Sequence, residues 1–369
     1  MALGTTQAIN TGDDDVSLDT HARGLLLRRM SDLAVLPPGR LTAQERALVD
    51  LVLASGVSRL DVVSRKRLAE RVAQLPEGPA ELTLALARDE IEVAGPVLRG
   101  SVGLPSGELV QIIREASDAH HLAIAERKHL PGAVVDALVE HAELAAHCRL
   151  LANPAAEVSN RSLEILVRRS AAEEELQPLL LARSEMNIRL AQLMFWWVSP
   201  EARREILTRY SVERRQLYTA LDDVLESGLA ASATDEVLQA ALSLVRMPVL
   251  ATKQQSARLV DHATRHSRDE LIAEISFMGR VRPETAYRIF SDIGGEPMAV
   301  FGKAVGMSRS EFSDLLSALA SMRGLDPDDV RSQTRVSTVF DMISNDRADF
   351  VLHCWDWAMS ADAQMPIDG

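Results

Sequence analysis

The stretch "SDAHHLAIAERKHLPGAVVDALVEHAELAAHCRLLANP", Ser117 to Pro154, decides the fold class. A short polar turn precedes one aliphatic run, and a second aliphatic run follows Pro131 and Gly132. Because a proline in the first turn of a helix loses no hydrogen bond, the pattern predicts two helices joined by a short connection. One such pair cannot bury its apolar face alone, so further pairs must stack against it.

Comparable segments recur along the chain at intervals of roughly 30 residues. They place four aliphatic residues early in successive expected helices: Val93, Leu122, Val158 and Ile188. Aromatic residues make up only 4% of the chain, and no run alternates apolar with polar residues as a half-buried strand does. The pattern therefore predicts an all-α protein in which helical pairs stack into a solenoid with a continuous core.

Several expected helix ends carry capping signals. In a capping box, a hydroxyl and a carboxylate satisfy the free amides of the first turn. The predicted boxes are Thr42 with Glu45, Ser267 with Glu270, and Ser308 with Glu311. Gly279 and Gly306 each follow an expected helix, where a left-handed cap is usual. Near the C-terminus, "FVLHCWDWAM" predicts a closing helix with Phe350, Cys354 and Trp357 on its buried stripe and Trp355 beside it.

The predicted domain boundary lies in "ESGLAASATDE", Glu226 to Glu236, which is small, polar and without periodic apolar residues. This linker separates a helical repeat domain over 20–225 from a helical C-terminal domain over 237–359. Residues 1–19 are expected to form a disordered acidic leader, and residues 360–369 a flexible tail.

The segment "AIAERKHLPGAVVDALVE", Ala123 to Glu140, together with "LLANPAAEVS" and "GKAVGMSRSEF", resembles a bacterial family of uncharacterised domains built from HEAT-like helical pairs. The resemblance covers roughly residues 20–355 and is most specific in the first segment. It implies a HEAT-like α-solenoid followed by a smaller helical C-terminal region. It implies no established activity, and it gives no catalytic residue to carry over.

Charge and cysteine content limit the classes of function. The net charge of −13 argues against a nucleic-acid binder, because such proteins usually present a basic surface to phosphates. Cys148 and Cys354 are the only cysteines, so neither a disulfide framework nor a thiolate metal site is indicated, and a reducing cytoplasm is expected. No stretch approaches the roughly 18 apolar residues of a membrane span.

Five of the nine histidines lie between His120 and His147, which raises the question of a metal site. Two ligands on one helix must be three or four positions apart to face the same ion, and only Glu143 and His147 meet that condition. We therefore expect no metal and no cofactor. His129 is instead expected to hydrogen-bond carbonyls at a helix end, and His120 to lie on a polar margin.

The strongest local departure from average composition is "LMFWWVSPEARRE", Leu193 to Glu205. Helical spacing places Trp197 on a core stripe and Phe195 and Trp196 at its flanks, so the flanking rings are either buried by neighbouring helices or exposed as anchors. The candidate partner-binding residues are Phe195, Trp196, Arg203, Arg204 and Arg209. An alternative is an anion site at Arg161, Arg168, Arg169, Arg214 and Arg215, although charge runs are usually solvated faces.

No catalytic motif is present in the sequence. There is no GxSxG elbow, HExxH motif, Walker loop or GxGxxG turn, and Gly294 with Gly295 in "SDIGGEPMAV" is typical of a helix connection. We expect a non-catalytic cytoplasmic scaffold or adaptor that binds proteins through solenoid grooves. The alternative is a sensor for an anionic small ligand or nucleotide, and a third, less supported hypothesis is an enzyme or DNA-modifying protein on the same scaffold.

The partner-binding hypothesis carries its own expectation. Changing Trp196 to alanine, or Arg203 and Arg204 together to alanine, should weaken partner binding and leave the fold intact. If the cluster is instead part of the core, the same changes should lower the melting temperature.

Overall fold

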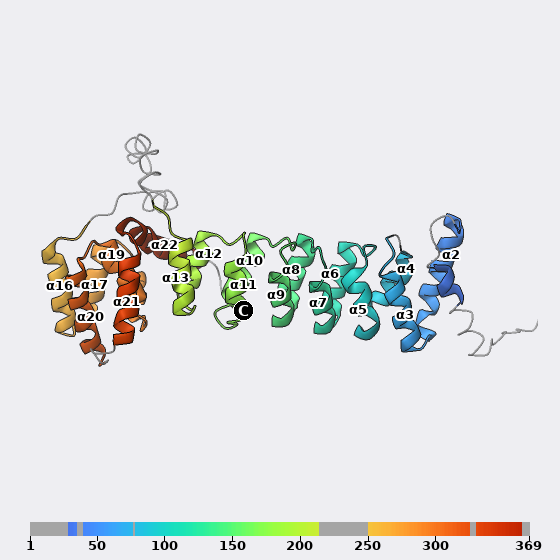
Figure 1. Cartoon of the computed structure of the whole chain (residues 1–369), viewed down its shortest axis with the longest axis horizontal. Helices are drawn as coiled ribbons and strands as arrows, with labels where there is room; N and C mark the ends of the chain where they lie inside the picture. Colours follow the sequence, from blue (N-terminus) through green and yellow to red (C-terminus); the bar gives the residue numbers. More distant parts are fainter. Residues whose placement is uncertain (1–28, 35–39, 77, 214–249, 325–329, 364–369) are drawn as a thin grey trace, which may run out of the picture. The chain divides into compact units, whose positions relative to one another are not determined.

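The computed structural model describes residues 29–34, 40–76, 78–213, 250–324 and 330–363 (Figure 1). These ranges contain no named strand, and their β pairing is limited to one isolated bridge between Leu130 and Ala156. The predicted all-α class is confirmed. The chain divides into two compact units, Met1–Ser162 (unit 1) and Leu163–Gly369 (unit 2). The predicted leader 1–19 and linker 226–236 lie outside the described residues.

Unit 1 is a stack of short helices that follow one another in chain order (Figure 1). The helix α3 packs on α5, α5 on α7 and α7 on α9, while α2 packs on α4 and α6 on α8. Each helix therefore contacts the helix two positions along the chain, which confirms the predicted stacked pairs. The elements are α2 (Ala43–Gly56), η1 (Val57–Arg59), α3 (Val62–Val72), α4 (Ala80–Ala87), α5 (Ile91–Gly100), α6 (Ser106–Glu115), α7 (Asp118–Ala125), α8 (Gly132–His141) and α9 (Leu144–Leu151).

The core of unit 1 consists of small aliphatic side chains at helical spacing. Val93 and Val97 of α5 and Ile124 of α7 are completely buried, and each such side chain contributes roughly 1.5–3 kcal/mol by leaving water. Val93 and Leu122 lie within helices, as the repeat pattern predicted. The placement of Val158 was wrong, because α10 begins two residues later, at Asn160.

Buried histidines donate to carbonyl groups near the C-terminal ends of helices in unit 1. Nε2 of His121, on α7, lies 2.7 Å from the carbonyl of Ile113 near the end of α6, and Nε2 of His147, on α9, lies 3.2 Å from the carbonyl of Leu138 on α8. A carbonyl oxygen can only accept, so each Nε2 carries the proton. Each histidine thus supplies a donor to the preceding helix of the stack.

His120 is also buried, and its predicted position on a polar margin was wrong. Its ring lies 2.9 Å from both the hydroxyl of Ser117 and the carbonyl of Asp89. The exposed His129 makes no hydrogen bond among the described residues, so the carbonyl-capping role expected for it belongs to His121 and His147. The sequence pattern missed this because the capped carbonyls lie on a neighbouring helix and not on the histidine's own.

We expect His147→Leu to lower the free energy of unfolding by about 1 kcal/mol, because the buried Leu138 carbonyl loses this donor and keeps the Ala142 amide. His147→Gln should recover most of the loss, because a glutamine amide can donate to the same carbonyl. Gln177 of α11 (Leu176–Ala182) makes a bond of this kind, to the Ser170 carbonyl at 2.9 Å. Urea unfolding of the two variants, with His129→Leu as the exposed control, measures the difference. Equal losses in the leucine and glutamine variants would contradict the capping role.

Unit 2 combines the later repeat helices with the C-terminal helices. Residues 163–213 and 250–358 meet within it, because α12 packs on α22 and α22 also packs on α19. Further packed pairs are α16 with α20, α17 with α18, and α19 with α21. Besides α11, the helices are α10 (Asn160–Arg169), α12 (Ile188–Met194), α13 (Pro200–Arg209), α16 (Lys253–Thr264), α17 (Arg268–Gly279), α18 (Pro283–Ser291), α19 (Glu296–Ala304), α20 (Arg309–Arg323), α21 (Val330–Met342) and α22 (Asn345–Ala363).

Two of the three predicted capping boxes are present, those of Thr42 with Glu45 and of Ser308 with Glu311. The box predicted at Ser267 was wrong, because Glu270 instead lies 3.0 Å from the ring of His262. A box that was not predicted begins α16, where Thr252 pairs with Gln255.

The two predicted glycine caps differ. Gly306 has a φ of +78° and forms the expected left-handed turn after α19. The expectation for Gly279 was wrong: Arg280 takes the left-handed conformation, and Gly279 stays in α17. A Cβ at Gly279 would lie 3.2 Å from Leu352 and 3.4 Å from Phe301, so glycine allows α17 to pack closely there.

Candidate functional site

The predicted aromatic anchors lie at the end of α12 and belong to a cluster with α22. The ring of Trp355 lies 4.7 Å from that of Phe195 and 4.9 Å from that of Trp196. Phe195 and Trp355 are completely buried, and Trp196 is half-buried. Of the two alternatives, the structure therefore places Phe195 in the core of unit 2, and part of Trp196 reaches the surface.

Polar contacts fix the orientation of the aromatic cluster. The indole of Trp355 donates to the Gln192 side chain at 3.0 Å, and Gln192 donates in turn to the Tyr210 carbonyl at 2.8 Å. The Arg288 guanidinium lies 4.7 Å from the ring centre of Trp196, which is a cation–π distance. The predicted stripe on α22 was wrong by two positions at its end: Trp355 is buried and Trp357 is 37% exposed.

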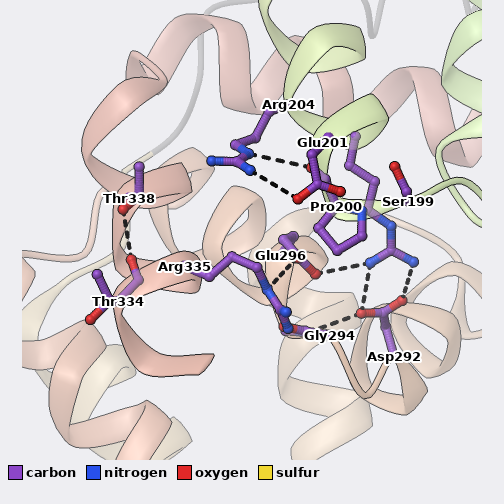
Figure 2. A network of polar contacts seen from close by, with 12 residues as sticks. Ser199, Pro200, Glu201, Arg204, Asp292, Gly294, Glu296, Thr334, Arg335 and Thr338 are labelled. Carbon is purple, nitrogen blue, oxygen red and sulfur yellow. Dashed lines mark hydrogen bonds and ion pairs between the residues drawn. The ribbon is translucent and has the colours of Figure 1, made fainter. Parts of the chain in front are cut away.

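Arg203 lies at the centre of a buried ion network at the start of α19 (Figure 2). Its two terminal nitrogens contact the two carboxylate oxygens of Asp292 at 3.1 and 2.8 Å, in bidentate geometry. The first of these nitrogens also donates to Glu296 at 2.9 Å. The guanidinium stacks 5.1 Å from the Phe195 ring centre, which joins the network to the aromatic cluster.

The second half of the network comes from α21. Nε of Arg335 forms an ion pair with the other oxygen of Glu296 at 2.9 Å, and a terminal nitrogen of Arg335 reaches the Gly294 carbonyl at 3.3 Å (Figure 2). A Cβ at Gly294 would lie 2.3 Å from Glu296, and Gly295 has a φ of +81°. The two glycines are therefore required so that the turn can bring both carboxylates to the arginines.

The network of two arginines and two carboxylates is close to electrically neutral. Burial alone would lower the pKa of Arg203, but the hydrogen bonds and charges of Asp292 and Glu296 raise it overall. Glu296 is almost completely buried and contacts two guanidinium groups. Because the charges of the network compensate one another, its ion pairs connect α13, α19 and α21 and leave little net charge to bind a ligand.

The other candidate arginines of the partner-binding set are more exposed. Arg204 contacts Glu201 and the Pro200 carbonyl, each at 3.4 Å (Figure 2). Arg209 lies 3.6 Å from Glu205 and donates to the Leu181 carbonyl at 2.7 Å.

Of the arginines of the alternative anion site, the structure describes Arg161, Arg168 and Arg169, all on α10. Arg161, in unit 1, pairs with Glu140 at 3.2 Å. In unit 2, Arg168 pairs with Glu164, which Arg189 also contacts at 2.9 Å. Burial would raise the pKa of Glu164, but these two arginines lower it overall. Arg169 ends α10, and Arg214 and Arg215 lie outside the described residues.

A small polar cavity lies between α20 and α21. Its volume is about 210 Å³, below the roughly 300–1,000 Å³ typical of ligand pockets. An ion pair between Arg309 and Asp341 stands at its wall. The lining residues are Arg309, Gln333, Thr334, Ser337, Thr338 and Asp341. Hydroxyl and amide groups make up most of the lining. None of the lining residues is a buried charged side chain that would suggest a catalytic role for this cavity.

Large apolar side chains are exposed on α17, on α18 and in the turn after α18. Phe277 is 66% exposed, Tyr287 49% and Ile293 82%. The helices α17 and α18 pack on each other, and Arg268 at the start of α17 lies 5.2 Å from the ring centre of Tyr287. We call Arg268, Tyr287 and Ile293 the α17–α18 surface; Phe277 is nine residues after Arg268 and lies on the opposite face of α17. Sequence reasoning missed this surface because single aromatic residues on amphipathic helices are ordinarily read as core.

The described residues contain no group of three or more His, Cys, Asp or Glu side chains placed to hold a metal ion. None of the helices in the described ranges is long and apolar enough to cross a membrane.

Comparison with known proteins gives one match. A family model described as "Uncharacterised protein conserved in bacteria (DUF2336)" matches residues 93–353, well over half of the 369 residues. No curated protein and no solved structure matches the chain.

Proposed function

The chain belongs to the uncharacterised bacterial family DUF2336, and from its structure we propose that it is a non-catalytic cytoplasmic scaffold that binds a protein partner. Family membership confirms the resemblance noted in Ala123–Glu140, although the matched range begins at residue 93 and not near 20. The family's description names no activity, so the proposal rests on the molecule's own surfaces.

The observation that carries the proposal is the exposure of large apolar residues on α17, on α18 and in the turn after α18. Apolar side-chain surface is exposed to solvent on two packed helices and the turn that follows them, at Phe277, Tyr287 and Ile293. Exposed aromatic residues beside an arginine are the residue types that dominate binding energy in protein interfaces. The aromatic pair predicted from sequence, Phe195 and Trp196, contributes mainly to packing within unit 2.

The charged groups of unit 2 support binding in preference to catalysis. A catalytic carboxylate or base needs access to substrate, whereas Glu296 is enclosed and contacts two arginines. The alternative function, a sensor for an anionic small ligand, has less support because Arg161 and Arg168 already pair with carboxylates.

Affinity capture from a bacterial cytoplasmic extract tests the proposal. We expect the wild-type chain to retain a stoichiometric protein partner, and the double variant Phe277→Ala, Tyr287→Ala to lose it because the exposed aromatic area is removed. Met342→Ala, at a 43% exposed position on α21, is the matched control and should retain the partner. Absence of any stoichiometric protein with the wild-type chain would contradict the scaffold function.

A further inference from the structure

We propose that the α17–α18 surface binds a peptide segment that carries a carboxylate next to an aliphatic or aromatic side chain. This inference rests on the proposed scaffold function and names the class of partner. Arg268 would take the carboxylate, and Tyr287 with Ile293 would take the apolar side chain.

The first supporting observation is the stacking of cations on aromatic rings. The Arg268 guanidinium lies 5.2 Å from the ring centre of Tyr287 and 5.6 Å from that of Phe290. Arg323 lies 5.4 Å from the Phe290 ring and donates to the Phe290 and Asp292 carbonyls. Phe290 is thus contacted by two guanidinium groups, which hold α17, α18 and the end of α20 together beside the exposed Tyr287.

The second observation is that Tyr287 is already oriented. Hydrogen bonds to Ser291 and Arg268, with the positive charge of Arg268, lower the pKa of Tyr287. A side chain held in one orientation loses less conformational entropy when a partner binds, so an exposed aromatic ring of this kind is a favourable anchor. Ile293, two residues past the end of α18, is a further exposed apolar side chain on this part of the chain.

The third observation concerns charge. Arg268 makes no ion pair with a carboxylate in the part of the chain that the structure describes, whereas its neighbour Arg265 pairs with Asp261 at 3.0 Å. The acids nearest to Arg268 in sequence are Asp269 and Glu270, and Glu270 contacts His262. Glu284 is exposed one turn before Tyr287. Arg268 therefore retains donors for a carboxylate from outside.

The net charge of −13 favours a short acidic segment over a nucleic acid. A polyanion would be repelled along its whole length by the acidic surface, whereas a peptide with one or two carboxylates can pair with Arg268 alone. Apolar contact with Tyr287 and Ile293 would then supply the affinity that one exposed ion pair cannot.

A random 12-residue peptide library displayed on phage is the probe. Selection on the wild-type chain should enrich peptides that hold Asp or Glu next to Leu, Ile or an aromatic residue. Fluorescence polarisation with synthetic copies should then show at least about a 10-fold weaker affinity for Arg268→Glu and for Tyr287→Ala. Arg265→Glu is the matched control, because it makes the same charge change one turn away, and it should bind the selected peptides within about 2-fold.

Other outcomes would overturn the inference. Enrichment of basic or purely apolar peptides would contradict the choice of partner, as would equal affinity in Arg268→Glu and the wild-type chain. Tighter binding of a 20-nucleotide single-stranded DNA than of any selected peptide, lost in Arg268→Glu, would assign the surface to nucleic acid. If affinity capture retains a protein equally with the wild-type and Arg268→Glu chains, the scaffold function is supported and the binding role assigned to the α17–α18 surface is wrong. If no partner is captured, the scaffold function itself is contradicted.

Discussion

Arg203→Ala is expected to lower the free energy of unfolding of unit 2 by about 3–5 kcal/mol, because the change leaves Asp292 and Glu296 charged without their main partner in a buried position. This differs from the expectation based on sequence, in which loss of Arg203 weakens binding and leaves the fold intact. Urea unfolding followed by far-ultraviolet circular dichroism measures the loss. The helix content of the folded baseline shows whether the variant still folds.

Arg204→Ala is the matched control for Arg203→Ala. It removes the same side chain from the next position on α13, but Arg204 is 40% exposed and its ion pair with Glu201 at 3.4 Å contributes about 0–1 kcal/mol. A second control, Arg203→Leu combined with Asp292→Asn and Glu296→Gln, removes the uncompensated charges and should recover part of the stability. Equal losses for Arg203→Ala and Arg204→Ala would show that the buried network does not stabilise unit 2.

Trp355→Ala is expected to cost about 3–5 kcal/mol, which is the usual range for truncating a buried tryptophan. The change opens a cavity beside Phe195 and Trp196 and leaves the Gln192 oxygen without its indole donor. Thermal unfolding monitored by intrinsic tryptophan fluorescence measures the loss, because Trp196 remains in the cluster as one of the emitting residues.

Trp357→Ala on the same helix provides the comparison for Trp355→Ala. Trp357 is 37% exposed, so its truncation should cost less than that of the completely buried Trp355. A larger loss for Trp357 than for Trp355 would restore the stripe that the sequence predicted and would contradict the packing of α22 described above.

The fold was predictable because its rules are local. The start of α8 after Pro131, the aliphatic spacing of α5 and α7, and the capping box at Thr42 each depend on residues within one or two turns of one another. Stacking of the pairs then follows from the apolar face that each pair leaves uncovered. The errors at Ser267 and Gly279 arose where a residue of another helix, His262 or Leu352, competes for the same position.

The site was less predictable because its contacts join distant parts of the sequence. The arginine run after Trp197 stands next to Glu201 and Glu205, which suggests a solvated face, and nothing nearby indicates that Arg203 pairs with Asp292. The glycines of "SDIGGEPMAV" were correctly placed in a helix connection. The acids on each side of them, Asp292 and Glu296, form the contacts with Arg203. Exposure of Phe277 and Tyr287 likewise depends on which helices cover α17 and α18.

The sequence separation of these contacts has a consequence for biosynthesis. In unit 1, the buried histidines bond to carbonyl groups 8, 9 and 31 positions earlier in the chain, so each repeat can complete these hydrogen bonds as soon as it leaves the ribosome. In unit 2, the carboxylate partners of Arg203 lie 89 and 93 residues later in the chain. The indole that donates to Gln192 lies 163 residues later. Contacts of long sequence separation form slowly, so α12 and α13 emerge during translation with their aromatic and charged groups unsatisfied until the C-terminal helices have been made. A ribosome stalled before residue 292 would therefore hold a finished unit 1 and an unfinished unit 2, a state open to chaperones and proteases.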